Sequence, residues 1–223
     1  MTRLNIIVEG PTEETFVREL LAPHLGQHNV FAIARSVETG RRKGRIFRGG
    51  LVHYEKVRKD IQSWLKQDSA ALVSTMFDYY ALPKDFPKPA TPQGGVPVHQ
   101  WVPQLEQALS EDIRDIRFVP YIQLHEFEAL LFSDVEKTGA VLSATPDQLE
   151  QLRRIRAAFE TPEHINDSPE TAPSKRLLQL FPGYDKPVFG SLALGRIGLS
   201  AIRQSCPHFA GWLTRLESLS SQS

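Results

Sequence analysis

The stretch from residue 4 to residue 21 limits the possible folds most strongly. Residues 4–8 form a near-continuous apolar run, which is typical of a strand covered on both faces. The run stops at Glu9-Gly10-Pro11, and the apolar residues that follow repeat with the 3.6-residue period of a helix. Pro11 suits the first helical position, where its missing N–H costs nothing. A strand that turns this tightly into a helix predicts an α/β fold.

Length and composition are those of an ordinary globular protein. The chain has 223 residues, enough for one domain or for one domain with a helical extension. Lys plus Arg and Asp plus Glu both total 26, so the net charge neither favours nor excludes nucleic acid as a partner. The single cysteine, Cys206, excludes an intrachain disulfide and a cysteine-based zinc site. Because no signal peptide or apolar run of transmembrane length is found, we expect a cytoplasmic protein.

Further along the chain, predicted strands and helices alternate. Extended patterns at 29–37, 71–77 and 117–124 alternate with amphipathic patterns at 51–67 and 101–112, and from residue 146 the pattern is mainly helical. A strand–helix–strand order favours parallel pairing with right-handed crossovers. We therefore predict a core at residues 1–135, with a mainly parallel sheet flanked by helices. A mainly helical part at residues 136–223 is expected to pack on this core, and the two together can form a single compact domain.

Acidic residues stand where two of the predicted strands end. Glu9 follows the first strand and Asp78 follows the strand at 71–77. Because the carboxyl ends of parallel strands meet at one edge of a sheet, we expect these two carboxylates to lie close together. Converging carboxylates repel each other unless a cation neutralises them, and Mg²⁺ typically takes one or two carboxylates together with substrate phosphates. The alternative, an acid–base pair of the glycosidase kind, needs a cleft lined by aromatic residues that this pattern does not indicate.

Other charged residues extend this candidate site. Glu13 lies in the first turn of the first helix, as a capping acid or as a ligand. His125, Glu126 and Glu128 follow the last predicted strand. Only one of the two glutamates is expected to reach a cation placed by Glu9, because residues two apart point to different sides of a helix.

A glycine-rich segment between the first and second helices is strongly basic. We call the following five residues the basic cluster: Arg41, Arg42, Lys43, Arg45 and Arg48. We interpret the segment as a surface loop, because it carries too much charge to pack into a core. It is either a solvated surface or a patch that binds the phosphates of nucleic acid. The P-loop pattern G-x-x-x-x-G-K-[ST] is absent from the sequence.

Four segments, VEGPTEE, MFDYY, HEFEALLFSD and PSKR…GSLALGRIGL, together resemble a family of poorly characterised bacterial proteins in the TOPRIM clan, relatives of the OLD-type nucleases. The resemblance spans nearly the whole chain and implies a TOPRIM-like, Rossmann-like sheet with a divalent-metal site. It makes Glu9 the TOPRIM glutamate, Glu13 the nearby acid and Asp78 the first acid of the D-x-D pair. Lys186 is the nearest candidate for the lysine of OLD-type sites. Tyr80 stands where the second acid of the pair is expected.

The resemblance implies a Mg²⁺- or Mn²⁺-dependent nuclease that cuts or nicks nucleic acid. As its nucleic-acid partner we expect DNA in preference to RNA, although the sequence does not separate the two. Its relatives are often encoded beside an ABC- or SMC-like ATPase, which implies phage defence with such a partner. Glu9 and Asp78 would act in catalysis and metal binding, with Glu13 as a ligand and Glu126 or Glu128 as supplementary ligands.

Two alternatives to this nuclease remain open. Tyrosine is a poor Mg²⁺ ligand, so Tyr80 favours a non-catalytic TOPRIM-fold subunit that docks on and regulates the ATPase. Phosphoryl or nucleotidyl transfer to a small substrate would use the same metal site. It would also need a nucleotide pocket, which the sequence does not reveal.

Overall fold

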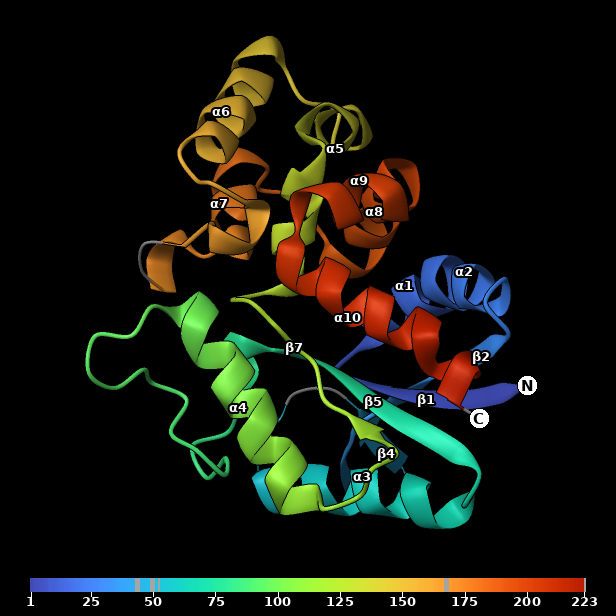
Figure 1. The fold of residues 1–223 in the computed structure, drawn as a ribbon. Coiled ribbons are helices and arrows are strands. Elements are labelled where there is room, and N and C mark those ends of the chain that lie inside the picture. The colour runs from blue at the N-terminus through green and yellow to red at the C-terminus, as the bar shows by residue number, and fades with distance from the viewer. Residues whose placement is uncertain (43–44, 49–50, 52, 167–168, 223) are drawn as a thin grey trace. The chain divides into compact units, whose positions relative to one another are not determined.

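The computed structural model describes every residue except 43–44, 49–50, 52, 167–168 and 223. The chain divides into two compact units (Figure 1). Unit 1 comprises Met1–Gln123 and Leu216–Ser223, and unit 2 comprises Leu124–Arg215. The boundary predicted from the sequence lies at residue 135, whereas these units part after Gln123.

Unit 1 is built on a parallel sheet with the strand order β2-β1-β5-β6, and β7 also pairs with β5. The strands are β1 (Thr2–Val8), β2 (Val30–Ser36), β5 (Ala71–Asp78), β6 (Phe118–Val119) and β7 (Ile122–Gln123). The predicted α/β class and the mainly parallel sheet are confirmed. Ile6, Ile7 and Val8 are at most 1% exposed, which explains why the first strand is apolar on both faces.

The connections of this sheet create a switch point between β1 and β5. β1 is joined to β2 through α1 (Pro11–Phe16), a π-helical turn (Val17–Leu21) and α2 (Ala22–Gly26). β5 is joined to β6 through α4 (Val98–Ile113). The chain therefore leaves β1 and β5 toward opposite edges of the sheet. In open parallel sheets, ligands bind at such a point, outside the carboxyl ends of the strands.

Helices cover both faces of this sheet. α3 (Tyr54–Gln67), which leads into β5, lies with α4 on one side of the sheet, and α1 and α2 lie on the other side (Figure 1). Helix α1 begins at Pro11, as the sequence predicts. Helices α3 and α4 match the amphipathic patterns at 51–67 and 101–112.

The strand predicted at 117–124 is split at Pro120 into β6 and β7. Proline has no N–H to give to the ladder, so pairing with β5 stops on either side of it. The Thr75 hydroxyl replaces the missing ladder bonds. It donates to the carbonyl of Tyr121 at 2.9 Å and accepts the Tyr121 N–H at 2.9 Å. Ser74 also donates to the carbonyl of Val119, at 2.6 Å.

Substituting Thr75→Val should lower the free energy of unfolding by roughly 1–3 kcal/mol, because it removes both hydrogen bonds to the buried Tyr121 backbone. Valine has nearly the same shape, so the loss measures the bonds and not a cavity. Urea denaturation would give the difference. Thr91→Val, at an exposed position outside the sheet, is the matched control and should change stability by less than ~0.5 kcal/mol. Equal stability of the two variants would contradict this role of Thr75.

The basic segment predicted as a loop is a β-hairpin, so that prediction is wrong. β3 (Glu38–Arg42) pairs antiparallel with β4 (Arg45–Arg48), and Arg42 lies opposite Arg45. β3 ends at Arg42 and β4 begins at Arg45, so the two strands lie close together in the chain. The high charge and glycine content of the segment led to the prediction of a loop. Lys43 lies outside the described residues.

Unit 2 is mostly helical, as the sequence predicts. Its α-helices are α5 (Val135–Val141), α6 (Pro146–Ala157), α7 (Pro173–Leu180), α8 (Ser191–Ile197), α9 (Leu199–Ser205) and the first part of α10 (Pro207–Glu217). Helices α8 and α9 are separated by Gly198, whose φ of 80° cannot continue a helix. The apolar residues after Glu126 form a 3₁₀ helix, Phe127–Ser133, instead of the expected α-helix. Among the described residues, no helix is long and apolar enough to cross a membrane.

Candidate functional site

Glu9 and Asp78 lie at the carboxyl ends of neighbouring strands. β1 and β5 pair in parallel with Val8 opposite Met76, so Glu9 stands beside the end of β5. The Oε1 atom of Glu9 accepts a hydrogen bond from the backbone N–H of Asp78 at 2.5 Å. The structure therefore brings these two residues together at the switch point of the sheet, as expected from the strand order.

The turn between β1 and α1 also places Glu13 near this edge. Glu13 lies in the first turn of α1 and is 4% exposed. A Cβ atom added to Gly10 would lie 3.3 Å from Oε2 of Glu13, closer than most real contacts of this kind. A larger residue at position 10 would therefore press on the carboxylate. Glycine leaves the space that Glu13 uses.

A fourth acid marks the end of β2. The Ser36 hydroxyl, on the last residue of β2, donates a hydrogen bond to Oε2 of Glu14 at 2.7 Å. The carboxyl ends of β2, β1 and β5 thus each have an acidic side chain beside them. Glu13 and Glu14 are neighbours in the sequence, and the structure gives them different surroundings.

The chemistry of this edge suits a hard divalent cation. Mg²⁺ prefers oxygen ligands and usually keeps several waters, so one or two carboxylates are enough when substrate phosphates supply the rest. Among the described residues, Glu9, Glu13 and Asp78 do not form a group whose ligand atoms all lie within 4.8 Å of one another. These acids therefore do not enclose an ion by themselves, and water and phosphate would have to supply its other ligands.

Two tyrosines follow Asp78 directly. Tyr80 lies in a 3₁₀ turn, is 38% exposed, and has its ring 5.6 Å from the ring of Tyr79. The Tyr79 hydroxyl donates to the carbonyl of Ala90 at 2.7 Å, and burial raises the pKa of this phenol. The position expected for the second acid is therefore occupied by a half-exposed aromatic side chain.

Glu128 and Lys186, two other predicted site residues, contact each other in unit 2. Lys186 Nζ lies 3.0 Å from Oε2 of Glu128 and 5.5 Å from the centre of the Phe127 ring. Glu128 is 3% exposed, and burial raises the pKa of its carboxyl group, although the charge of Lys186 acts in the opposite direction. The pair joins the 3₁₀ helix to the π-helical turn Lys186–Gly190.

Glu126 and His125 are also held within unit 2. Oε2 of Glu126 accepts a hydrogen bond from the backbone N–H of Ser174 at 2.9 Å, in the first turn of α7. His125 has a φ of 59° and is 6% exposed. Burial, with a smaller contribution from His164, lowers the pKa of His125 to about 4, so the imidazole is neutral at pH 7. The role of Glu126 and Glu128 as supplementary metal ligands stays a prediction.

A second group of potential ligands in unit 1 was not predicted from the sequence. It consists of His24, His28 and Glu217. The spacing of the two histidines is visible in the sequence. Glu217, however, is 193 residues away from His24, and only the fold brings it there.

Two solved structures are similar to the chain over nearly its whole length. One is the C-terminal region of the Burkholderia pseudomallei OLD protein, with a TM-score of 0.46, 14% identity and coverage of 98% of both chains. Another is the C-terminal region of the Xanthomonas campestris pv. campestris OLD protein, with a TM-score of 0.42, 14% identity and coverage of 100% of this chain and 99% of that one. No curated protein matches the sequence. The model of the family described as "Domain of unknown function (DUF4276)" matches residues 8–217, and the chain therefore belongs to this family.

Proposed function

We propose that the chain is a TOPRIM-type nuclease that depends on a divalent metal and cuts or nicks nucleic acid, DNA in preference to RNA. The observation that carries this proposal is the hydrogen bond from the Asp78 backbone to the Glu9 carboxylate at the switch point. Glu13 is buried in the adjoining turn and adds a third carboxylate. Acids gathered where a parallel sheet binds its ligands are suited to holding a metal beside a phosphate.

Glu9, Asp78 and Glu13 would hold Mg²⁺ or Mn²⁺ at this edge. A bound ion would polarise the phosphate and activate a water molecule. The hydrogen bond from the Asp78 N–H orients the Glu9 carboxylate. A fixed orientation would help Glu9 whether it acts as a metal ligand or as a general acid–base. Gly10 leaves room for the Glu13 carboxylate, which a larger residue at position 10 would displace.

The hairpin of β3 and β4 is the proposed phosphate-binding surface, because it carries four arginines of the basic cluster. Changing Arg41, Arg42 and Arg45 to glutamine should weaken binding to duplex DNA. It should also reduce the slope of log K against log salt by about one for each phosphate that the variant no longer neutralises. Fluorescence anisotropy at several salt concentrations measures both quantities.

The matched control for the hairpin variant changes three exposed basic residues elsewhere, Lys59, Lys66 and Arg154, to glutamine. This control removes the same net charge and should keep the wild-type salt slope. An unchanged slope in the hairpin variant would mean that the basic cluster is only a solvated surface.

A second candidate function is a non-catalytic subunit that docks on an ABC- or SMC-like ATPase. Tyr80 favours it, since a half-exposed tyrosine follows Asp78 where a metal-binding acid is expected, and tyrosine is a poor Mg²⁺ ligand. In this function the exposed surface of unit 1 would bind the ATPase, and the acids at the sheet edge would have no catalytic role.

A nicking assay on supercoiled plasmid and on RNA separates the two functions. The wild type is tested alone and with an ATPase partner, in Mg²⁺, in Mn²⁺ and in EDTA. Cleavage that requires the cation supports the nuclease. Absence of cleavage at every cation concentration, with the partner bound equally by wild type and Glu9→Gln, supports the docking subunit.

A further inference from the structure

The helical segment after β1 ends in two histidines that lie together. Pro23 has no N–H for a regular helical bond, and a π-helical turn precedes it, in which the Ala22 N–H bonds to the carbonyl of Val17. His24 lies in the short helix α2 that follows, and His28 comes four residues later. This spacing places both imidazoles on one side, with their ring centres 5.1 Å apart.

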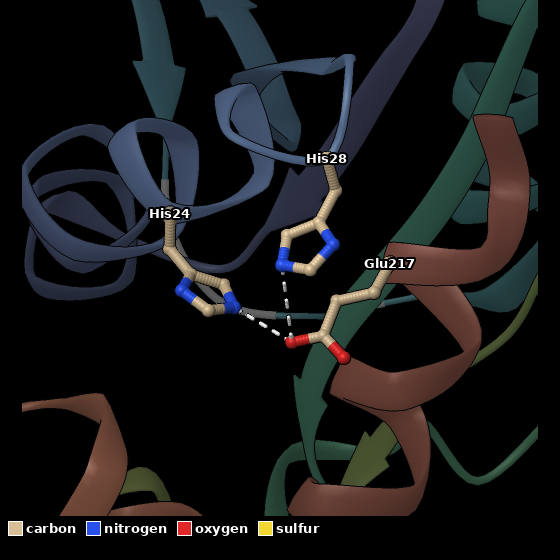
Figure 2. Close-up of side chains that lie close together, drawn as sticks. All are labelled: His24, His28 and Glu217. Carbon is tan, nitrogen blue, oxygen red and sulfur yellow. Dashed lines mark hydrogen bonds and ion pairs between the residues drawn. The ribbon is translucent and has the colours of Figure 1, made fainter.

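Glu217, the last residue of α10, meets both imidazoles, and all three residues belong to unit 1. Oε1 of Glu217 lies 2.6 Å from Nε2 of His24 and 3.9 Å from Nε2 of His28. Figure 2 shows the two rings turned toward the same carboxylate oxygen. One ligand atom from each of the three residues lies within 4.8 Å of the others.

We propose that His24, His28 and Glu217 bind a Zn²⁺ ion, at a site separate from the acids of the sheet edge. Two imidazoles and one carboxylate are ligands that Zn²⁺ accepts, whereas Mg²⁺ prefers oxygen ligands alone. Three protein ligands leave the fourth tetrahedral position for water. The proposal does not depend on the nuclease function.

The distances and exposure fit such an ion. Zn–N and Zn–O bonds of about 2.0–2.1 Å place tetrahedral ligands roughly 3.3 Å apart. The separations of 2.6 and 3.9 Å reach this value through shifts of less than ~1 Å, which side-chain rotation supplies. The Glu217 side chain is 12% exposed, and those of His24 and His28 are 27% and 42% exposed. Glu217 is therefore shielded while the imidazole side stays open to an entering ion.

The bound ion would fasten the C-terminal end of the chain to α2 within unit 1. Leu216 and Leu219, on either side of Glu217, are buried, so this end already has apolar contacts. Binding of Zn²⁺ by Glu217, which lies between these two leucines in the sequence, would add a contact that depends on the Zn²⁺ concentration. Removing the metal should therefore loosen the C-terminal residues first.

The test is calorimetric titration of the full chain with Zn²⁺ after dialysis against EDTA, together with thermal melts. We expect one equivalent of Zn²⁺ to bind wild type and to raise its melting temperature. His28→Gln and Glu217→Gln should each weaken binding by at least ~10-fold. His28 is the most exposed ligand, so its variant should fold normally even if Glu217→Gln does not.

Two controls make the result specific. His99→Gln changes an exposed histidine on α4 and should bind Zn²⁺ as wild type does. Glu9→Gln should also keep the Zn²⁺ affinity, which separates this site from the proposed nuclease site. Failure to bind one equivalent of Zn²⁺, or wild-type binding by His28→Gln, would overturn the proposal and would leave a metal-free ion pair.

Discussion

Replacing Glu9 with glutamine is expected to abolish Mg²⁺- or Mn²⁺-dependent cleavage, with a loss of ~10²-fold or more if the carboxylate also transfers a proton. Glutamine keeps the shape of the side chain and can still accept the Asp78 N–H bond, but it lacks the charge that a cation needs. Asp78→Asn removes the charge on the neighbouring strand and should have the same effect. The initial rate of plasmid nicking measures the loss.

The control for these variants is Glu19→Gln, which removes an exposed acid that lies near Glu13 in the chain. It should cleave at the wild-type rate. Without metal, the melting temperatures of Glu9→Gln and Asp78→Asn should be no more than about 3 °C below that of wild type, and can exceed it. The reason is that each change relieves repulsion between carboxylates. Cleavage at the wild-type rate by Glu9→Gln would exclude this residue from the site.

Replacing Lys186 with methionine should destabilise the protein by an amount that depends on pH, because Lys186 pairs with the buried Glu128. Burial raises the pKa of Glu128 in the folded protein, so ionising this carboxyl group costs stability as the pH rises above its ordinary pKa of about 4.3. Lys186, 3.0 Å away, limits that cost. The difference between Lys186→Met and wild type should therefore be small near pH 4 and reach about 2–3 kcal/mol at pH 7. Urea denaturation across this pH range measures it.

Two comparisons assign this effect to the pair. Lys175→Met changes an exposed lysine on α7 and should leave stability unchanged. The double variant Glu128→Gln with Lys186→Met replaces both charges by neutral groups and should recover most of the stability of the wild type. A loss in Lys186→Met that is the same at pH 4 and pH 7 would show that the charge of Glu128 is not its cause.

The two central strands, β1 and β5, could be predicted because each is a mainly apolar run that ends abruptly at an acid. Residues 4–8 are buried, and so are residues 71–77 except Leu72, so their composition marks them as strands in the interior of a sheet. Parallel pairing then follows from the intervening helices. The adjacency of Glu9 and Asp78 is a consequence of this order, and it required no knowledge of side-chain contacts.

Features that depend on tertiary contacts could not be predicted in this way. The split at Pro120 depends on the Thr75 hydroxyl, which supplies hydrogen bonds from another strand. The Glu126 carboxylate accepts a hydrogen bond from the N–H of Ser174, which is 48 residues away in the sequence. Glu128 and Lys186 are both candidates for the metal site in the sequence, and their mutual contact appears only in the fold.

The most direct test of the proposed nuclease site is the anomalous diffraction of a crystal soaked in Mn²⁺. We expect a manganese peak at the carboxyl ends of β1 and β5, within coordination distance of a Glu9 or Asp78 carboxylate oxygen. The same soak of Glu9→Gln should lose the peak or weaken it strongly. A well-ordered wild-type crystal with no manganese at this edge, at millimolar Mn²⁺ and with a nucleotide phosphate present, would contradict the proposal.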